Sequence, residues 1–151
     1  MRKFKIYLDN CCFNRPYDDQ SQETIRLETQ AKLFIQEAVQ AEQLQLVWSF
    51  MLDFENGANP YEERRDNIAQ WKSMASEVID IQEKVRERAK IIERESGVRS
   101  KDAFHLACSI AAKCDYFITT DRELKKKTKI KHVTVISPID FVFLMEEENE
   151  E

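Results

Sequence analysis

Four carboxylates stand where the sequence leaves a predicted strand or enters a predicted helix. Asp9 and Asp121 each follow directly after a short apolar, β-rich run. Asp102 falls in the first turn of a predicted helix, and Glu55 comes shortly after another strand. In a parallel sheet these positions face the same edge, which is where open α/β sheets bind their ligands. We therefore expect the four acids to meet at one edge of a sheet.

Carboxylates that cluster in this way repel one another, and divalent cations relieve the repulsion. Oxygen-only ligands suit Mg²⁺ or Mn²⁺ better than Zn²⁺. Such ions activate water for in-line attack on a phosphodiester and stabilise the departing 3′-oxygen. The pattern thus indicates a metal-dependent phosphodiesterase in which Asp9, Glu55, Asp102 and Asp121 are both metal ligands and catalytic residues.

Each acid also has a purely structural interpretation. Asp102 can complement a helix dipole, and Asp9 and Asp121 can form turns. Glu55 can be an ordinary surface residue, with Asp53 as the competing choice for the second acid. The functional hypothesis depends on the joint arrangement of all four positions.

The spacing of apolar residues predicts the elements that would position these acids. Strands are predicted at 4–8, 44–49, 116–119 and 132–136, and helices at 24–42, 51–56, 61–95 with a division near Ser76, 100–113 and 139–145. This alternation predicts a three-layer α/β/α sandwich with a mostly parallel central sheet. Asp115 precedes its strand, so it is expected at the opposite edge.

Composition sets the class of protein. The chain has 151 residues, 42% of them hydrophobic and 34% charged, with only 2 Gly and 3 Pro. These values exclude a collagen-like or disordered chain, and no apolar run approaches the roughly 20 residues that cross a bilayer. We expect one domain at 1–145 and a disordered acidic tail at 146–151. The charged start of the chain does not resemble a secretory signal, so a cytoplasmic location is expected.

Charge and cysteine content leave nucleic acid open as a partner and argue against zinc. The formal net charge is −5, from 23 basic and 28 acidic residues, and five of the acids are in the tail. The body is therefore nearly neutral, so the acidic pI argues only weakly against nucleic acid. The four cysteines lack paired zinc-ligand spacing, and we expect them to be reduced and mostly buried.

Three segments resemble the signature segments of PIN-domain proteins, a family that includes the toxin ribonucleases of bacterial toxin–antitoxin modules. They are LDNCCFNRP at 8–16, KDAFHLA at 101–107 and ITTD at 118–121. The resemblance extends over the whole chain except the glutamate tail. It implies a PIN-like fold and a Mg²⁺- or Mn²⁺-dependent endoribonuclease that cleaves RNA. It further implies a homodimer and an antitoxin protein as a potential partner.

The resemblance also implies roles for individual residues. Asp9, Asp102 and Asp121 match the first, third and fourth acids of the family, and Glu55 is the best match to the second. The hydroxyl residue before the fourth acid is matched by Thr119 or Thr120.

Three further side chains are candidates for supporting or substrate contacts. Asn10 is expected to orient a water or a phosphate beside Asp9. Arg15, in the loop after the first acid, and Lys125, in the lysine-rich segment after Asp121, are expected to contact the RNA backbone.

Two other functions stay open at this point. A PIN-like fold that has lost catalysis would serve as a binding module. A receiver-type signalling domain would need paired acids after the first strand and a lysine at the end of the last strand. Asp9 has no acidic neighbour, and Ile136, Ser137 and Pro138 occupy the lysine position.

Overall fold

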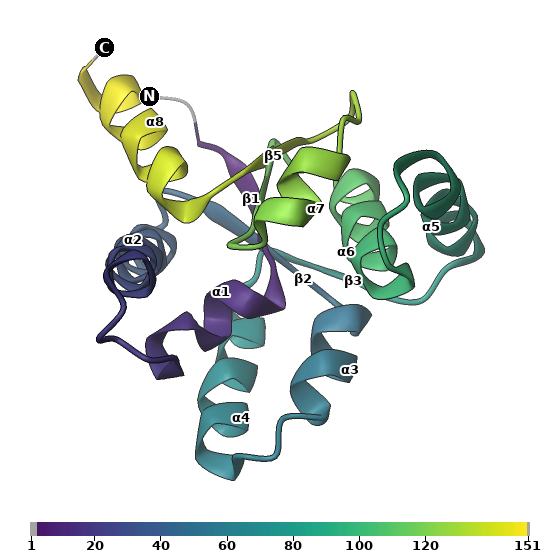
Figure 1. Cartoon of the computed structure of the whole chain (residues 1–151). Coiled ribbons are helices and arrows are strands. Elements are labelled where there is room, and N and C mark those ends of the chain that lie inside the picture. The colour runs from purple at the N-terminus through teal and green to yellow at the C-terminus, as the bar shows by residue number, and fades with distance from the viewer. Residues whose placement is uncertain (1–2, 151) are drawn as a thin grey trace.

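A five-stranded, all-parallel sheet forms the centre of the computed structural model, which describes residues 3–150 (Figure 1). Its strands are β1 (Lys5–Leu8), β2 (Gln45–Ser49), β3 (Glu77–Ile79), β4 (Tyr116–Ile118) and β5 (Thr134–Ile136). The order across the sheet is β3-β2-β1-β4-β5. The chain therefore builds outward from β1, first to one side and then to the other.

Helices cover both faces of the sheet. They are α1 (Asn10–Asn14), α2 (Glu23–Gln40), α3 (Phe50–Gly57), α4 (Glu62–Ala69), α5 (Glu83–Ser96), α6 (Ser100–Ala111), α7 (Arg122–Lys127) and α8 (Pro138–Glu150), with short 3-10 turns at Arg15–Tyr17 and Gln70–Met74. Figure 1 shows α2 and α8 on one side of the sheet and α5 and α6 on the other. The predicted three-layer α/β/α sandwich is confirmed.

The central strand β1 is buried on both faces. Ile6, Tyr7 and Leu8 are all 0% exposed, as expected for a strand with helices above and below it. The rings of Tyr7 and Phe117 stack with centroids 5.2 Å apart, which joins β1 to β4 through side chains as well as backbone. This rigid pair of strands carries the residues that follow them.

The strand order reverses between β1 and β4. Leu8 is paired with Ile118 at the ends of the two strands, and the Asp9 N–H donates to the Ile118 carbonyl oxygen at 2.9 Å. In open α/β sheets, such a reversal opens a crevice beyond the carboxyl ends of the strands. Asp9 lies at this crevice because it directly follows β1, and Asp121 follows β4 by three residues.

The predicted helical region at 61–95 divides near Ser76 as expected, but it contains a strand that was not predicted. It is divided into α4 and α5, and the edge strand β3 lies between them and pairs with β2. The Ser76 N–H donates to the Leu46 carbonyl oxygen at 2.8 Å and starts this pairing. Val78 and Ile81, two apolar residues within the range predicted as helix, are 39% and 76% exposed. A strand of three residues is too short to show its own periodicity.

The acidic tail also differs from expectation. Residues 146–150 continue α8 and are not a disordered segment, while Glu151 lies outside the described residues. Glutamate is a good helix former, so a helix that is already packed can extend through such a run. Within residues 3–150, no helix is long and apolar enough to cross a lipid bilayer.

The cysteines are as predicted. All four are free, with Cys12, Cys108 and Cys114 buried and Cys11 partly exposed.

Candidate active site

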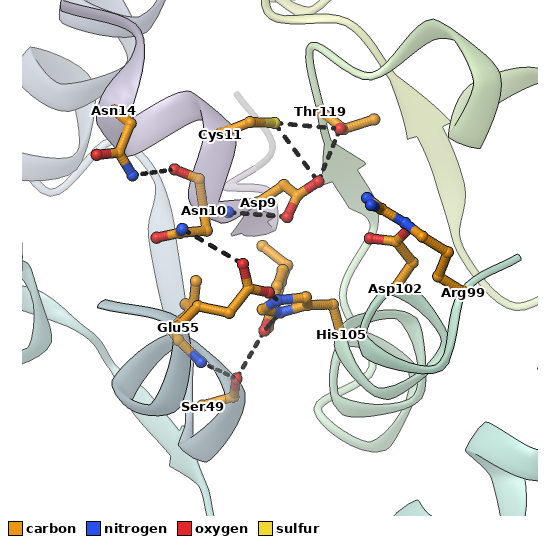
Figure 2. A network of polar contacts seen from close by, with 12 residues as sticks. Asp9, Asn10, Cys11, Asn14, Ser49, Glu55, Arg99, Asp102, His105 and Thr119 are labelled. Carbon is orange, nitrogen blue, oxygen red and sulfur yellow. Dashed lines mark hydrogen bonds and ion pairs between the residues drawn. The ribbon is translucent and has the colours of Figure 1, made fainter. Parts of the chain in front are cut away.

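The carboxylate of Asp9 is fixed by the first turn of α1 and by the end of β4. Its Oδ1 accepts the N–H of Asn10 at 2.8 Å, so Asp9 caps α1. Its Oδ2 accepts the hydroxyl of Thr119 at 2.8 Å, and the same Thr119 oxygen accepts the N–H of Asp121 at 3.1 Å. Thr119 thereby ties two of the predicted acids together, as Figure 2 shows for Asp9.

Asp121 is held by the helix that it starts. One carboxylate oxygen accepts the N–H groups of Glu123 and Leu124 at 3.0 and 3.1 Å, which makes Asp121 the N-cap of α7. This capping directs the other carboxylate oxygen away from the helix backbone and leaves it available to a ligand.

Asp102 carries a charge that the protein compensates only weakly. Its carboxylate accepts from Arg99 Nε at 3.2 Å, but the Arg99 side chain is 81% exposed, so the pair is screened by water. Burial, and next the negative charge of Asp9, raise the pKa of Asp102 above its usual value against the opposing effect of Arg99. The negative charge of Asp9 therefore acts on the carboxyl group of Asp102 across the crevice.

Glu55 is bound to a buried histidine. His105, from α6, is 0% exposed, and its Nε2 contacts Glu55 Oε1 (Figure 2). The other carboxylate oxygen of Glu55 accepts from the Asn10 amide at 3.4 Å. Burial raises the pKa of Glu55, but the hydrogen bond and charge of His105, with Lys101 and Asn10, outweigh it and leave this pKa below its usual value.

A chain of hydroxyl groups supports the same histidine from below. His105 Nδ1 lies 2.6 Å from the Tyr7 hydroxyl, which lies 2.6 Å from the Ser49 hydroxyl. Burial works to lower the pKa of His105, but Glu55, Asp9 and Asp102 together raise it above its usual value. This network fixes the ring of His105 and, through it, the position of Glu55.

All four predicted acids line one cavity of about 340 Å³, together with Asn10, Arg99 and others. Asp53, the competing second acid, does not line this cavity. Its oxygens accept from Trp48 Nε1 at 2.9 Å and Lys72 Nζ at 3.0 Å. The arrangement expected from the strand ends, with scattered acids converging on one edge, is present in the fold.

The donors of this cavity suit a hard divalent cation in their chemistry. They are mainly carboxylate and amide oxygens; the Cys11 thiol, which lies 3.5 Å from Asp9 Oδ2, and the Arg99 guanidinium also line the cavity. Among residues 3–150, no three His, Cys, Asp or Glu side chains stand close enough to hold one ion as they are. The set therefore fits Mg²⁺ or Mn²⁺ in composition, and the carboxylates would have to draw together around the ion.

The two predicted substrate contacts are engaged within the protein. Arg15 donates from Nε and Nη2 to Glu28 Oε1 at 3.0 and 2.8 Å, and from Nη1 to Asp18 at 3.0 Å. Lys125 Nζ lies 3.3 Å from Asp140 Oδ2. Both roles stay predictions. Thr120 lines a neighbouring cavity, and Thr119 is the threonine that contacts Asp9.

The support that Tyr7 and Ser49 give to the site could not be predicted from the sequence. Tyr7 stands in the middle of an apolar strand, and Ser49 is the last residue of β2, so both are typical of ordinary strand residues. His105 follows Asp102 by about one helical turn, a spacing that favours a core or supporting role on the same side of the helix. Its contact with Glu55 could not be inferred, because that contact joins residues 50 positions apart.

Comparison with protein families gives one match that covers most of the chain. The family model described as PIN domain matches residues 6–130. The match contains Asp9, Glu55, Asp102 and Asp121. Among curated proteins, none matches this sequence.

Solved structures show the same fold at low sequence identity. PAE2754 from Pyrobaculum aerophilum superposes with a TM-score of 0.58 and 13% identity, over 96% of this chain and 90% of that one. VapBC2 from Rickettsia felis, in a structure bound to a DNA fragment from its promoter, gives a TM-score of 0.55 and 11% identity, over 88% of this chain and 98% of that one. At these identities the likeness concerns the fold.

Proposed function

Because this chain belongs to the PIN domain family, we propose that it is an endoribonuclease that hydrolyses RNA phosphodiester bonds with Mg²⁺ or Mn²⁺. PIN domains are generally nucleases that use divalent ions, which supports the reaction class. The observation that carries the proposal is the single cavity at the β1–β4 reversal, lined by Asp9, Glu55, Asp102 and Asp121. The family match favours this reaction over receiver-type signalling.

In this proposal Asp9, Asp102 and Asp121 hold the ion, with Glu55 as the fourth acid. When bound, the ion supplies Lewis acidity to the scissile phosphate and to the attacking water. Thr119 keeps the Asp9 carboxylate facing the cavity through its 2.8 Å hydrogen bond. His105 holds Glu55 in its ionised form, in which it can accept a proton from water or orient it.

The remaining groups of the cavity would act on the substrate. Asn10 lines the cavity, and its Nδ2 donates to Glu55 at 3.4 Å, so its amide holds this carboxylate beside Asp9 (Figure 2). Arg99 is exposed at the cavity mouth and can meet a phosphate oxygen.

The test is cleavage of labelled RNA by the purified protein. We expect cleavage of an unstructured and a structured RNA with Mn²⁺ or Mg²⁺, and none with EDTA. Asp121→Asn should lose at least about 100-fold in rate, because it removes a charge that offsets the ion. Asp66→Asn, an exposed acid on α4, is the matched control and should keep full activity. Equal cleavage by Asp121→Asn would refute the proposed function.

We further propose that the protein is the toxin of a toxin–antitoxin pair, acts in the cytoplasm and forms a homodimer. The PIN resemblance supports the toxin role. Helices α2 and α8 pack against each other and expose Leu27, Phe34 and Phe143, which supports an interface on that side. Growth arrest on expression, absent in Asp9→Asn, would support the toxin role. Light scattering would measure the dimer.

An inactive PIN-like binding module is the alternative. It predicts a folded protein whose calorimetric titration with Mn²⁺ gives no heat and whose RNA binding does not depend on Asp9.

A further inference from the structure

A second cavity, of about 640 Å³, adjoins the acid-lined one. It lies between α2, α7 and the start of α8, and Asp121 lines both cavities. Four cations line it, and we call it the lysine cavity: Arg122, Lys125, Lys126 and Lys129. Hydroxyl groups from three other segments complete the lining, namely Thr24, Thr119, Thr120 and Ser137.

The acids beside the lysine cavity do not neutralise its four cations. Glu28 is 5% exposed and accepts two hydrogen bonds from Arg15. Asp121 caps α7. Lys125 pairs with Asp140 at 3.3 Å, with both side chains about half exposed, and Lys126 reaches Glu123 only at 4.0 Å with both exposed. Such surface pairs are weak. The cavity therefore presents excess positive charge to a ligand.

We propose that the lysine cavity binds a backbone phosphate of the RNA strand next to the phosphate being cleaved, which rests on the proposed function. Lysine ammonium groups and hydroxyl groups are the usual contacts to a nucleic-acid backbone. Continuity with the acid-lined cavity favours RNA over an acidic peptide. A glutamate-rich peptide that continued past the lysine cavity would be repelled by the carboxylates of the acid-lined cavity. A phosphodiester strand would instead continue toward a cation held by those carboxylates.

Affinity and cleavage of a single-stranded 12-mer RNA test the proposal. The variant Lys126→Gln/Lys129→Gln removes two weakly paired charges. The matched control, Lys84→Gln/Lys90→Gln on α5, removes two charges on the far side of α6. We expect the first variant to raise Kd in EDTA, and KM with Mn²⁺, by about 3–10-fold and to lower the salt slope of log Kd by about 0.7 per lost contact. Its kcat should stay within about twofold, and the control should match the parent.

Two further measurements make the outcome specific. Asp140→Asn releases Lys125 from its pair and should tighten RNA binding about twofold or more. A dinucleotide substrate does not reach beyond the acid-lined cavity, so its cleavage should be the same for parent and lysine variant. A loss with the dinucleotide equal to the loss with the 12-mer would overturn the proposal.

The same data separate this inference from the proposed function. If the parent cleaves RNA and the lysine variant has unchanged KM and salt slope, the phosphate site is wrong while the nuclease stands. If lysine-dependent binding is present without cleavage, the phosphate site stands and the nuclease is wrong. If a polyglutamate peptide displaces the 12-mer at equal charge concentration, the cavity binds an acidic protein segment and the proposal is overturned.

Discussion

The two edges of the sheet carry acids of opposite character. At the amino-terminal edge, Asp115 Oδ2 accepts the N–H of Lys5 at 2.9 Å, and the ammonium of Lys5 contacts Glu77 at 3.1 Å and the Ala112 carbonyl at 3.0 Å. At the carboxyl-terminal edge, the chain supplies Asp9, Asp102 and Asp121 with hydroxyl and backbone donors and only one exposed arginine.

This difference separates structure from function within one sheet. Acids whose oxygens are satisfied within the chain stabilise the fold: Glu77 pairs with the Lys5 ammonium, and Asp115 accepts the Lys5 backbone N–H. At the other edge, burial and then the charge of Asp9 raise the pKa of Asp102, and acids compensated this weakly leave a position for an external cation.

The largest effect is expected when one acid is replaced at each edge of the sheet and the two variants are compared. Asp9→Asn keeps hydrogen-bonding capacity but removes the charge, so cleavage should fall by at least about 100-fold with the fold intact. Asp115→Ala should lower the free energy of unfolding by about 1–3 kcal/mol, because it leaves the Lys5 N–H without this partner. At a temperature where it is folded, Asp115→Ala should cleave at the parental rate.

Single-turnover cleavage and urea denaturation measure the two quantities. A comparable loss of cleavage in folded Asp115→Ala would break the separation between the edges.

A divalent cation should stabilise the protein through one edge only. At about 100 times its Kd, Mn²⁺ adds about 2.7 kcal/mol, which is roughly 5–10 °C of melting temperature in a domain of this size. The same rise should persist in Asp115→Ala and shrink in Asp102→Asn. Melting curves with and without Mn²⁺ measure it, and Ca²⁺ serves as a second hard ion. An equal rise in Asp102→Asn would place the ion elsewhere.

The third prediction concerns Glu55, the acid of the carboxyl-terminal edge that contacts the buried His105. Tyr7→Phe removes the hydroxyl that supports His105 Nδ1, so Glu55 should lose its fixed position, and cleavage should fall by about tenfold. The apparent pKa in the pH profile of the cleavage rate should change together with the rate, and so should the affinity for Mn²⁺. A merely structural role for Tyr7 would lower stability and leave both unchanged.

Ser49→Ala is the companion variant. It keeps the Tyr7–His105 contact and removes the last hydroxyl of the network, which also caps α3 by accepting the Leu52 N–H at 3.4 Å. Loss of this cap lowers stability, but His105 keeps its partner, so the effect on cleavage by the folded variant should be smaller. If Ser49→Ala is the more damaging of the two, the network does not act through His105.

Much of this organisation could be predicted from the sequence because the informative residues adjoin the elements that place them. Asp9 and Asp121 follow β1 and β4 within three residues, so the parallel sheet alone fixes their edge. The same argument places Asp115 at the other edge, where it pairs with Lys5.

What could not be predicted depends on tertiary contacts. Glu55 and Asp53 lie on the same short helix, and only the contacts of Asp53 with Trp48 and Lys72 separate their roles. The strand β3 is formed by pairing with β2 and not by its own sequence preference.

The smallest effect on activity is expected at Lys32, which tests whether an uncompensated charge is enough to mark a functional site. Lys32 is 4% exposed, no carboxylate among residues 3–150 pairs with it, and its ammonium lies 5.6 and 5.7 Å from the ring centroids of Phe13 and Trp71. Burial lowers its pKa to about 8 from the usual 10.5. Lys32 does not line the acid cavity.

Lys32→Met should therefore stabilise the protein and leave cleavage unchanged. Below pH 8 the lysine is charged in both folded and unfolded chains, and the folded state bears the full burial penalty. Between pH 8 and 10.5 the unfolded chain binds more protons, so parental stability rises with pH and the advantage of the variant fades. We expect a gain of about 1–2 kcal/mol at pH 7, since the two rings offset part of the penalty. Urea denaturation at pH 7 and pH 10 measures it. A loss of cleavage in the stable variant would show that a buried charge outside the cavity also serves the reaction, and charge compensation alone would then no longer separate structure from function.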